Sequence, residues 1–483
     1  MNAAARPQTA AGPSFAADAA LAAGGRLPQG GLTESGTASG RLAVTPWRGR
    51  LRGIAGSGVA STGAMLFALK LAGCGLGLGM HLALARLLGV SAYGTFATAF
   101  NAANLVAIFA ACGMPLTASR FLPRYLSLGE RDLAKGYLDA AAVATLAGGL
   151  AGGAILLASA LLARAEQPEL ALALAAASPL VLLLSLAQTA TALLQALHRP
   201  LAAEFPILIL RPLLVAGACA LLALPALRLL DAAMALLVLA LGSALALWPT
   251  GRALRRALAP LDLPARGRHP LRDWLAPGAL LLLLVGGAAL NERLDVMIVS
   301  AFVDPGEAGV YSVAARFGAL ISLGTAAATV RAMPMIAESL AQGDRGAAAR
   351  TAAQCTRTAL ALAAIGGVPL FLGAGPLLSL FGPGFESGAT ALRLLVAGHA
   401  ALAFGGAAST ALIASGNERR IAVVTGAGIL ANVLLNLLLV PRFGMDGAAM
   451  ATLATLALTG LGLVLTARRV LGIGVLSGRD LRI

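Results

Sequence analysis

The sequence predicts an all-α protein that crosses a membrane many times. Of its 483 residues, 58% are hydrophobic and 12% are charged, whereas a water-soluble chain carries about 25% charged residues. The mean hydropathy is +0.84. Apolar stretches of about 20 residues, long enough to cross a hydrocarbon core, recur along the chain between short charged breaks. Such a chain has too little polar material to cover its surface in water, so a bilayer is the solvent that fits it.

About twelve apolar segments are expected to span the membrane as helices. Pro179 is expected to kink the fourth span, and Pro206 or Pro212 the fifth, as membrane helices tolerate. The spans are placed at residues 62–82, 93–115, 138–163, 169–196, 205–225, 231–250, 275–302, 309–335, 356–375, 391–414, 421–440 and 446–466.

The positive charges predict the orientation of these spans. Most of the 36 Lys and Arg side chains lie in the N-terminal tail, the C-terminal tail and every second loop, whereas the alternate loops hold few. Because cytoplasmic loops carry the excess of Lys and Arg, both termini are expected in the cytoplasm. The net charge of +15 is thus interpreted as a topology signal, and no nucleic-acid partner is expected.

An internal repeat predicts how the helices are grouped. Met114–Pro115 aligns with Met333–Pro334, and residues 192–196 align with 411–415 at the same offset. Repeats of this kind are common in transporters. Six helices per repeat is an even number, so two six-helix bundles of parallel orientation are expected. The predicted organisation is a disordered cytoplasmic tail (1–52), an N-terminal bundle (53–250), a basic cytoplasmic linker (251–274), a C-terminal bundle (275–470) and a cytoplasmic tail (471–483).

The sequence offers no catalytic or metal site. The four cysteines lie far apart, without the short spacing of a metal site. No nucleotide-binding, metalloprotease or hydrolase motif occurs, and the longest internal loop is too short to form a catalytic domain. We therefore expect a protein that is not an enzyme and that carries no cofactor or metal.

Two cations are expected at a similar depth in the N-terminal bundle. Lys70 and Arg211 both lie roughly 10 to 12 Å from the cytoplasmic ends of their spans. A charge at the centre of a span costs at least about 2.5 to 3.5 kcal/mol, so each needs a partner or a wet cavity. One interpretation is a site for a phosphate, diphosphate or acidic sugar. In the other, Lys70 snorkels to the interface and Arg211 bonds to carbonyl groups freed by Pro206 or Pro212.

A second charged group lies in the seventh and eighth spans. Glu292 and Asp295 share one helix face and Arg293 points elsewhere, while Asp295 and Arg316 are expected at the same depth. One interpretation is a structural ion pair between Asp295 and Arg316. The other is coupling to a proton or sodium gradient through Glu292 or Asp295. His81, near the end of the first span, is interpreted as an interface residue.

Several stretches of the chain resemble bacterial polysaccharide exporters, and the likeness covers about residues 60–470. They correspond to the junction of the first two helices, the seventh-to-eighth helix region and the last two helices of those proteins. The stretches are Ala85–Ala97; Arg293–Asp295 with Ala308–Arg316; Met333–Asp344; and Asn432 and Asn436 with Leu439–Thr452. The chain is thus similar to the O-antigen flippases and lipopolysaccharide biosynthesis proteins of the multidrug/oligosaccharidyl-lipid/polysaccharide exporter superfamily.

The resemblance implies an activity. In that family, two six-helix bundles enclose a central cavity that alternates between the membrane faces and moves a polyprenyl-diphosphate-linked oligosaccharide across the bacterial inner membrane. Lys70, Arg211, Arg293 and Arg316 would then line a basic cavity. The implied partners are the lipid-linked oligosaccharide, membrane lipids, and the polysaccharide polymerase and chain-length machinery. Energy would come from an ion gradient or from removal of the product.

Four alternatives remain open at this point. A cation-coupled drug antiporter of the same fold would favour acidic and aromatic residues in its cavity, whereas cations outnumber acids in these spans. A lipid II flippase usually has two more helices. An O-antigen ligase or polymerase would need a long outer loop. A non-transporting scaffold of the assembly complex is the fourth.

Overall fold

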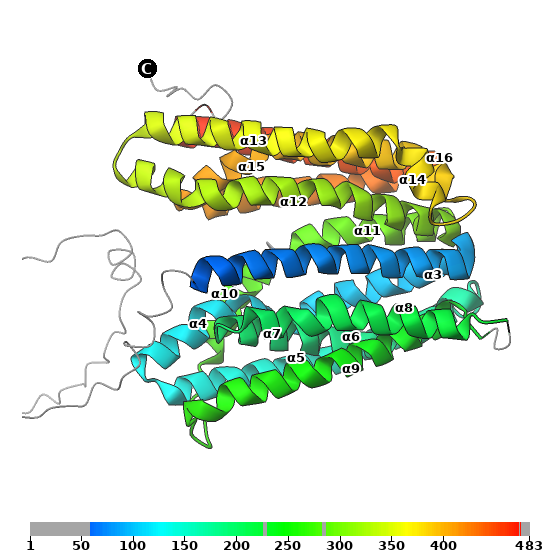
Figure 1. The fold of residues 1–483 in the computed structure, drawn as a ribbon, viewed down its shortest axis with the longest axis horizontal. Coiled ribbons are helices and arrows are strands. Elements are labelled where there is room, and N and C mark those ends of the chain that lie inside the picture. Colours follow the sequence, from blue (N-terminus) through cyan, green and yellow to red (C-terminus); the bar gives the residue numbers. More distant parts are fainter. Residues whose placement is uncertain (1–57, 226–228, 283–285, 473, 475–483) are drawn as a thin grey trace, which may run out of the picture. The chain divides into compact units, whose positions relative to one another are not determined.

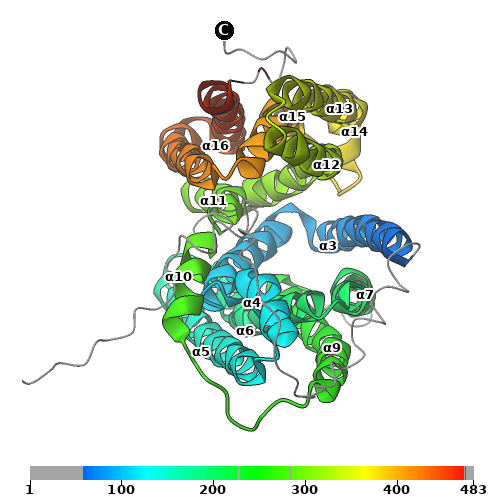
Figure 2. The same cartoon turned by 90° about the vertical axis from the view of Figure 1, so that its left-hand side faces the viewer.

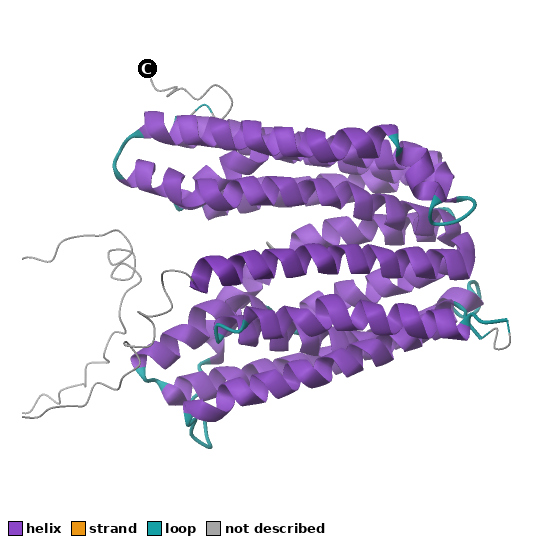
Figure 3. Ribbon diagram, in the orientation of Figure 1, coloured by secondary structure: helices purple, strands orange, loops and turns teal. Residues whose placement is uncertain are grey.

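The computed structural model describes residues 58–225, 229–282, 286–472 and 474. The tail expected over residues 1–52 lies outside this part, as does most of the tail expected over 471–483. Every element of the described residues is a helix (Figure 3). The predicted all-α class is therefore confirmed.

The first group of helices lies in the N-terminal half of the chain. It consists of α3 (Gly58–Ala110), α4 (Met114–Leu128), α5 (Arg131–Ala163), α6 (Pro168–Ala196), α7 (Pro200–Phe205), the π-helical turn η1 (Pro206–Leu210), α8 (Arg211–Leu222), α9 (Ala232–Leu258) and the 3₁₀ turn η2 (Ala259–Leu261).

The second group follows in the C-terminal half. It consists of α10 (Leu271–Leu281), α11 (Gly287–Phe302), α12 (Pro305–Ala341), α13 (Arg345–Leu372), α14 (Ala374–Ser379), η4 (Phe385–Gly388), α15 (Ala389–Ala414) and α16 (Glu418–Leu471). Helices α12 to α16 gather on one side and α3 to α9 on the other (Figures 1 and 2).

Helix α10 packs with the N-terminal group although it begins the second half. Its Trp274 is fully buried and donates a hydrogen bond through Nε1 to the hydroxyl of Tyr125 on α4, at 2.8 Å. A Cβ atom added at Gly113 would collide with the carbonyl oxygen of Gly278 on α10. The start of the expected seventh span therefore belongs, by its packing, to the first bundle.

Nine helical segments of the described residues are long and apolar enough to cross a membrane. These segments confirm the prediction that the chain is a polytopic membrane protein. Two of the segments contain a break, because α3 and α16 each include a residue with non-helical backbone angles, Gly89 and Gly444. The sequence predicted separate spans at both places, and the structure joins them by a sharp turn without a loop.

Both breaks need glycine. Gly89 has φ 75° and ψ 177°, and Gly444 has φ 58° and ψ −140°. A side chain at either position would strain the backbone, since residues other than glycine rarely adopt these angles. At Gly444 an added Cβ would also lie 2.5 Å from Oε2 of Glu307, whose carboxylate accepts the backbone N–H of Met445 at 3.0 Å.

Prolines shape the fifth predicted span. The chain forms α7, passes through the π-helical turn Pro206–Leu210, and continues as α8 from Arg211. The sequence expected a kink at Pro206 or Pro212, and the structure places a change of helix type there. Such π-helical turns are rare and often lie at functional sites.

Candidate substrate-binding cavity

One cavity of about 670 Å³ lies between the two groups of helices. Its lining comes from α3, η1 and α8 in the first half and from α11, α12, α15 and α16 in the second. The volume falls in the range of cavities that hold small ligands. The cavity is therefore formed by residues of both halves of the chain.

Three of the four predicted cavity cations meet in this cavity. Arg211 comes from the start of α8, Arg293 from α11 and Arg316 from α12, and all three line it. The Nε atoms of Arg211 and Arg316 are buried and form no hydrogen bond among the described residues. Nη1 of Arg293 donates to Oδ1 of Asn101 on α3 at 3.4 Å, which links the two halves.

The alternative explanation for Arg211 does not match the structure. The hydrogen bonds of the described residues include none from Arg211 to carbonyl groups near Pro206 or Pro212. Arg211 instead contributes to the lining of the cavity, in a protein that crosses a membrane. A guanidinium group offers paired N–H donors to the oxygens of a phosphate or carboxylate.

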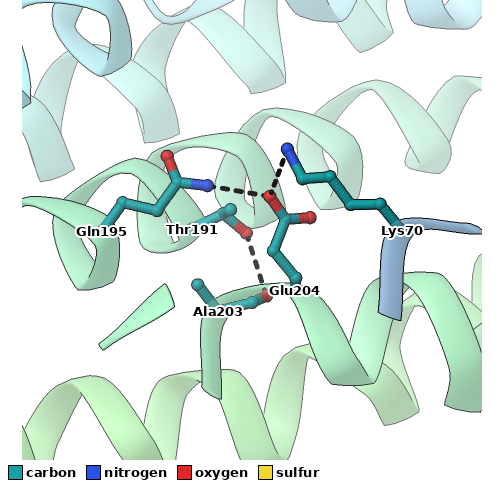
Figure 4. Close-up of polar contacts among 5 residues, drawn as sticks. All are labelled: Lys70, Thr191, Gln195, Ala203 and Glu204. Atoms are coloured by element: carbon teal, nitrogen blue, oxygen red, sulfur yellow. Dashed lines mark hydrogen bonds and ion pairs between the residues drawn. The ribbon is translucent and has the colours of Figure 1, made fainter. Parts of the chain in front are cut away.

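Lys70 lies outside the lining. It extends from α3 to α7, where Nζ lies 3.7 Å from Oε1 of Glu204, and its side chain is 57% exposed (Figure 4). The same carboxylate oxygen accepts a hydrogen bond from Nε2 of Gln195 on α6 at 2.9 Å. Lys70 thus has a carboxylate partner and is not part of the lining that the three arginines share.

Asp295 is held in a polar cluster within the C-terminal group. It is 2% exposed, and its carboxylate accepts hydrogen bonds from the hydroxyl of Tyr311 at 2.8 Å, from Nδ2 of Asn436 at 2.9 Å and from the hydroxyl of Thr452. Asn436 in turn donates to Asn432. This cluster joins α11, α12 and α16 at the cavity wall, where Asp295 and Thr452 contribute to the lining.

Two further expectations concern the charged group of the seventh and eighth spans. The expected Asp295–Arg316 ion pair stays a prediction. Arg316 interacts electrostatically with Tyr93 and His81 of α3. The side chain of Glu292 lies outside the described residues.

Two histidines in the lining did not emerge as site residues from the sequence. His81 of α3 is 4% exposed, and its Nδ1 lies 3.1 Å from the hydroxyl of Tyr93. His399 of α15 has its Nδ1 2.9 Å from the hydroxyl of Ser322 on α12. Both are titratable groups within predicted or observed spans, and that signal marks them for attention. Interpreting His81 as an interface residue missed its burial against the cavity.

The described residues contain no group of three His, Cys, Asp or Glu side chains that could hold a metal ion. Among the described residues, the lining of the cavity carries guanidinium, imidazole, hydroxyl, amide and carboxylate groups. Such groups can hold and release an anionic or polar ligand.

Comparison with known proteins identifies the family. The family model for polysaccharide biosynthesis proteins matches residues 59–340, which is more than half of the chain. The chain belongs to this family. No curated protein sequence matches the chain at a significant level.

Solved structures share the fold of this polysaccharide biosynthesis protein. An inward-facing multidrug resistance transporter of the MATE family, in the MOP superfamily, aligns with a TM-score of 0.65 and 13% identity over 82% of this chain and 94% of that chain. The lipid II flippase MurJ in an inward closed conformation aligns with a TM-score of 0.60 and 14% identity over 84% of this chain and 87% of that chain.

An outward-facing MATE family transporter of the MOP superfamily gives a TM-score of 0.58 and 15% identity, over 84% of this chain and 94% of that chain. At these identities the likeness is one of fold. The polysaccharide biosynthesis protein is thus a multi-pass membrane protein that shares its fold with these MATE and MurJ structures.

Proposed function

We propose that this transporter moves a polyprenyl-diphosphate-linked oligosaccharide across the bacterial inner membrane by alternating access. The observation that carries the proposal is the meeting of Arg211, Arg293 and Arg316, from both halves of a polysaccharide biosynthesis protein, in one cavity. A diphosphate is the anionic part of such a lipid, and guanidinium groups bind its oxygens through paired, charge-assisted hydrogen bonds. The polyprenyl tail would remain in the surrounding lipid.

The architecture in the proposal has twelve spans. Counting Gly89 and Gly444 as breaks between helices, and α10 with α11 as one span, turns the nine segments into twelve. Two parallel six-helix bundles around the cavity, with both termini in the cytoplasm, then follow from the repeat and from the Lys and Arg distribution. The polymerase and chain-length machinery of polysaccharide assembly are the proposed partners.

The composition of the cavity favours an anionic substrate over a cationic drug. Among the described residues, three arginines line it against one carboxylate, Asp295, whose oxygens accept three hydrogen bonds. A cationic ligand placed there would be repelled by the guanidinium groups, because charges interact strongly where water is scarce. This observation supports export of a lipid-linked anion and argues against the drug antiporter.

The test is deletion of the gene, followed by measurement of surface polysaccharide and of lipid-linked oligosaccharide in the inner membrane. We expect loss of the surface glycan and accumulation of intact lipid-linked units that remain inaccessible to a glycan-cleaving enzyme added from outside. The wild-type gene should restore the surface glycan. An Arg211→Ala, Arg316→Ala double variant, present at the same level in the membrane, should not restore it. Unchanged surface glycan with altered drug sensitivity would refute the proposal.

A further inference from the structure

The two walls of the cavity differ in chemistry. Every Ser, Thr or Tyr in its lining lies between Tyr311 and Thr459, on α12, α15 or α16. The lining from α3, η1 and α8 contains glycine and apolar residues together with His81, Asn101 and Arg211. Among the residues that the structure describes, the hydroxyl groups of the lining thus lie on the wall formed by the second half.

Three of these hydroxyl groups have no partner within the described residues. Ser409, Thr425 and Thr459 line the cavity and take part in none of the side-chain hydrogen bonds found there, whereas the neighbouring Thr410 donates to the carbonyl oxygen of Gly406 at 2.9 Å. A serine or threonine within a helix commonly bonds to the carbonyl group one turn before it. Hydroxyl groups that remain unbonded are free to bond to a molecule in the cavity.

A fixed imidazole extends the same wall. Nδ1 of His399 is engaged by the hydroxyl of Ser322 at 2.9 Å, and the ring lies against Gly318, where an added Cβ would be 3.3 Å from Cδ2. Nε2 of His399 forms no hydrogen bond among the described residues. An imidazole nitrogen donates or accepts according to its tautomer, so this nitrogen can serve a ligand in either role.

The position of the Thr459 hydroxyl depends on a glycine. A Cβ atom added at Gly428, on the first arm of α16, would collide with Oγ1 of Thr459 on the second arm. Gly428 also lines the cavity. The missing side chain at Gly428 lets the Thr459 hydroxyl lie close to the first arm at the cavity wall, and a methyl group there would displace it.

We propose that Ser322, His399, Ser409, Thr425 and Thr459, here called the hydroxyl wall, bind the sugar part of the transported lipid, separately from the arginines that bind its diphosphate. The inference rests on the proposed function. A sugar carries many hydroxyl groups that each donate and accept, and the groups of this wall do the same. Neutral hydrogen bonds contribute little net free energy each, so a glycan held by several of them can still be released.

The test compares two probes on purified full-length protein in lipid nanodiscs. One probe is undecaprenyl diphosphate without sugar, and the other is the lipid-linked oligosaccharide extracted from cells that lack the transporter gene. The main variant combines Ser409→Ala, Thr425→Val and Thr459→Val, which removes three hydroxyl groups with little change in volume. His399→Gln and Gly428→Ala are separate variants. Ser339→Ala combined with Thr358→Val is the matched control, because both hydroxyls are exposed and bond within their own helices.

For the triple variant we expect at least about tenfold weaker binding of the sugar-bearing probe, since three neutral hydrogen bonds are lost. Binding of undecaprenyl diphosphate should stay within about twofold of the wild-type value, because the arginines are unchanged. His399→Gln and Gly428→Ala should change binding in the same direction by smaller factors. The control variant should bind both probes as the wild type does.

Two other results would overturn the inference in distinguishable ways. In one, the variants keep the wild-type melting temperature and either bind both probes more weakly by the same factor or bind both with the wild-type affinity. Either finding would show that the hydroxyl wall does not recognise the sugar. Failure of the wild-type protein to bind either probe would refute the proposed function, and the inference would fall with it.

Discussion

At the level of single residues, burial of charge determines which positions matter. Arg211 and Arg316 keep buried Nε atoms without a partner among the described residues, and each such group costs free energy unless a ligand satisfies it. Lys70, at a similar predicted depth, has Glu204 as its partner. Lys70 therefore has a carboxylate partner, whereas the Nε atoms of these two arginines have no hydrogen-bond partner among the described residues.

Arg211 is expected to support glycan export mainly through its planar guanidinium group, which can donate two parallel hydrogen bonds to one anion. We expect Arg211→Ala to lower the initial rate of glycan export by about tenfold to a hundredfold, the size expected for lost charge-assisted hydrogen bonds. The export rate of Arg211→Lys should lie between those of Arg211→Ala and the wild type, because lysine keeps the positive charge but cannot form two parallel hydrogen bonds to one anion. Export is measured as radiolabelled surface glycan per unit of transporter. Arg164→Ala, at an exposed helix end, is the control and should export normally.

Asp295 and Glu292 are the two candidates for coupling to an ion gradient. The structure describes the side chain of Asp295 only, so the test uses that residue. Asp295→Asn keeps a carbonyl acceptor for the hydroxyl of Tyr311 but removes the negative charge. We expect this variant to bind undecaprenyl diphosphate normally in proteoliposomes and to lose the stimulation of transport by an imposed proton or sodium gradient. Stimulation equal to that of the wild-type protein would show that energy enters elsewhere.

At the level of elements, the ion pair of Lys70 and Glu204 joins α3 to α7 next to the π-helical turn. Gly73 of α3 also packs against this turn, where an added Cβ would lie only 2.7 Å from Cβ of Leu208. We expect Lys70→Glu and Glu204→Lys each to reduce export, and the combined swap to recover most of it, because the ion pair is re-formed. The measurement is a double-mutant cycle on export rates. If the swap is no better than the worse single variant, the pair does not link the helices.

The turn at Gly444 lets α16 reverse direction next to Glu307. We expect Gly444→Ala to lower the free energy of unfolding by about 1 to 3 kcal/mol, the cost of a strained backbone position. Its effect should be visible as a lower melting temperature of the purified protein. Gly426→Ala, on the same helix with open space around the added Cβ, should not lower it. Equal melting temperatures for the two variants would mean that the turn tolerates a side chain.

The helices were predictable from the sequence because the hydrocarbon core imposes long apolar stretches. The joined turns at Gly89 and Gly444 were not, since a single glycine between two apolar runs does not reveal its backbone angles. The packing of α10 on α4 was also missed. It depends on the Trp274–Tyr125 hydrogen bond and on the close approach at Gly113, contacts between segments that are far apart in the chain.

The site was predictable only where charge is involved. Arg211, Arg293 and Arg316 stood out because a charge inside an apolar span is costly. Lys70 had the same signal, but its partner lies on another helix and cannot be read from its own span. The hydroxyl wall gave no signal, because serine and threonine are common in membrane helices, where they usually bond to their own backbone.

For the whole molecule, the two halves share one arrangement around a buried tyrosine. Tyr93, early in the second arm of α3, contacts His81 of the first arm, and Tyr311, early in α12, contacts Asp295 of α11. Both tyrosines are at most 1% exposed. Each half thus ties its first helix to its second through a buried tyrosine and one ionisable side chain, and both of these ionisable groups line the cavity.

The two halves also meet closely near these tyrosines. A Cβ added at Gly309 of α12 would lie 2.7 Å from Cα of Gly94 on α3, and one added at Gly94 would collide with the carbonyl oxygen of Pro305. Nε of Arg86 donates to the carbonyl oxygen of Leu380 across the halves at 2.6 Å. Under the proposed topology this contact lies on the outer side, so it must separate before a ligand can leave outward.

Cys74 provides a native reporter of that separation, because it lines the cavity, while Cys219 and Cys355 are buried. In a Cys112→Ser background, we expect a membrane-impermeant maleimide added to intact cells to label Cys74 slowly. Gly94→Ala should speed labelling several-fold, because the added methyl group opposes closure of the outer contact at the cost of overpacking.

The control is Gly79→Ala, on the same helix with open space around the added Cβ. In this variant Cys74 should be labelled as slowly as in the parent protein. Fast labelling of the parent would place the open end of the cavity on the outer side, and equal labelling of both glycine variants would show that the Gly94–Gly309 contact does not control access.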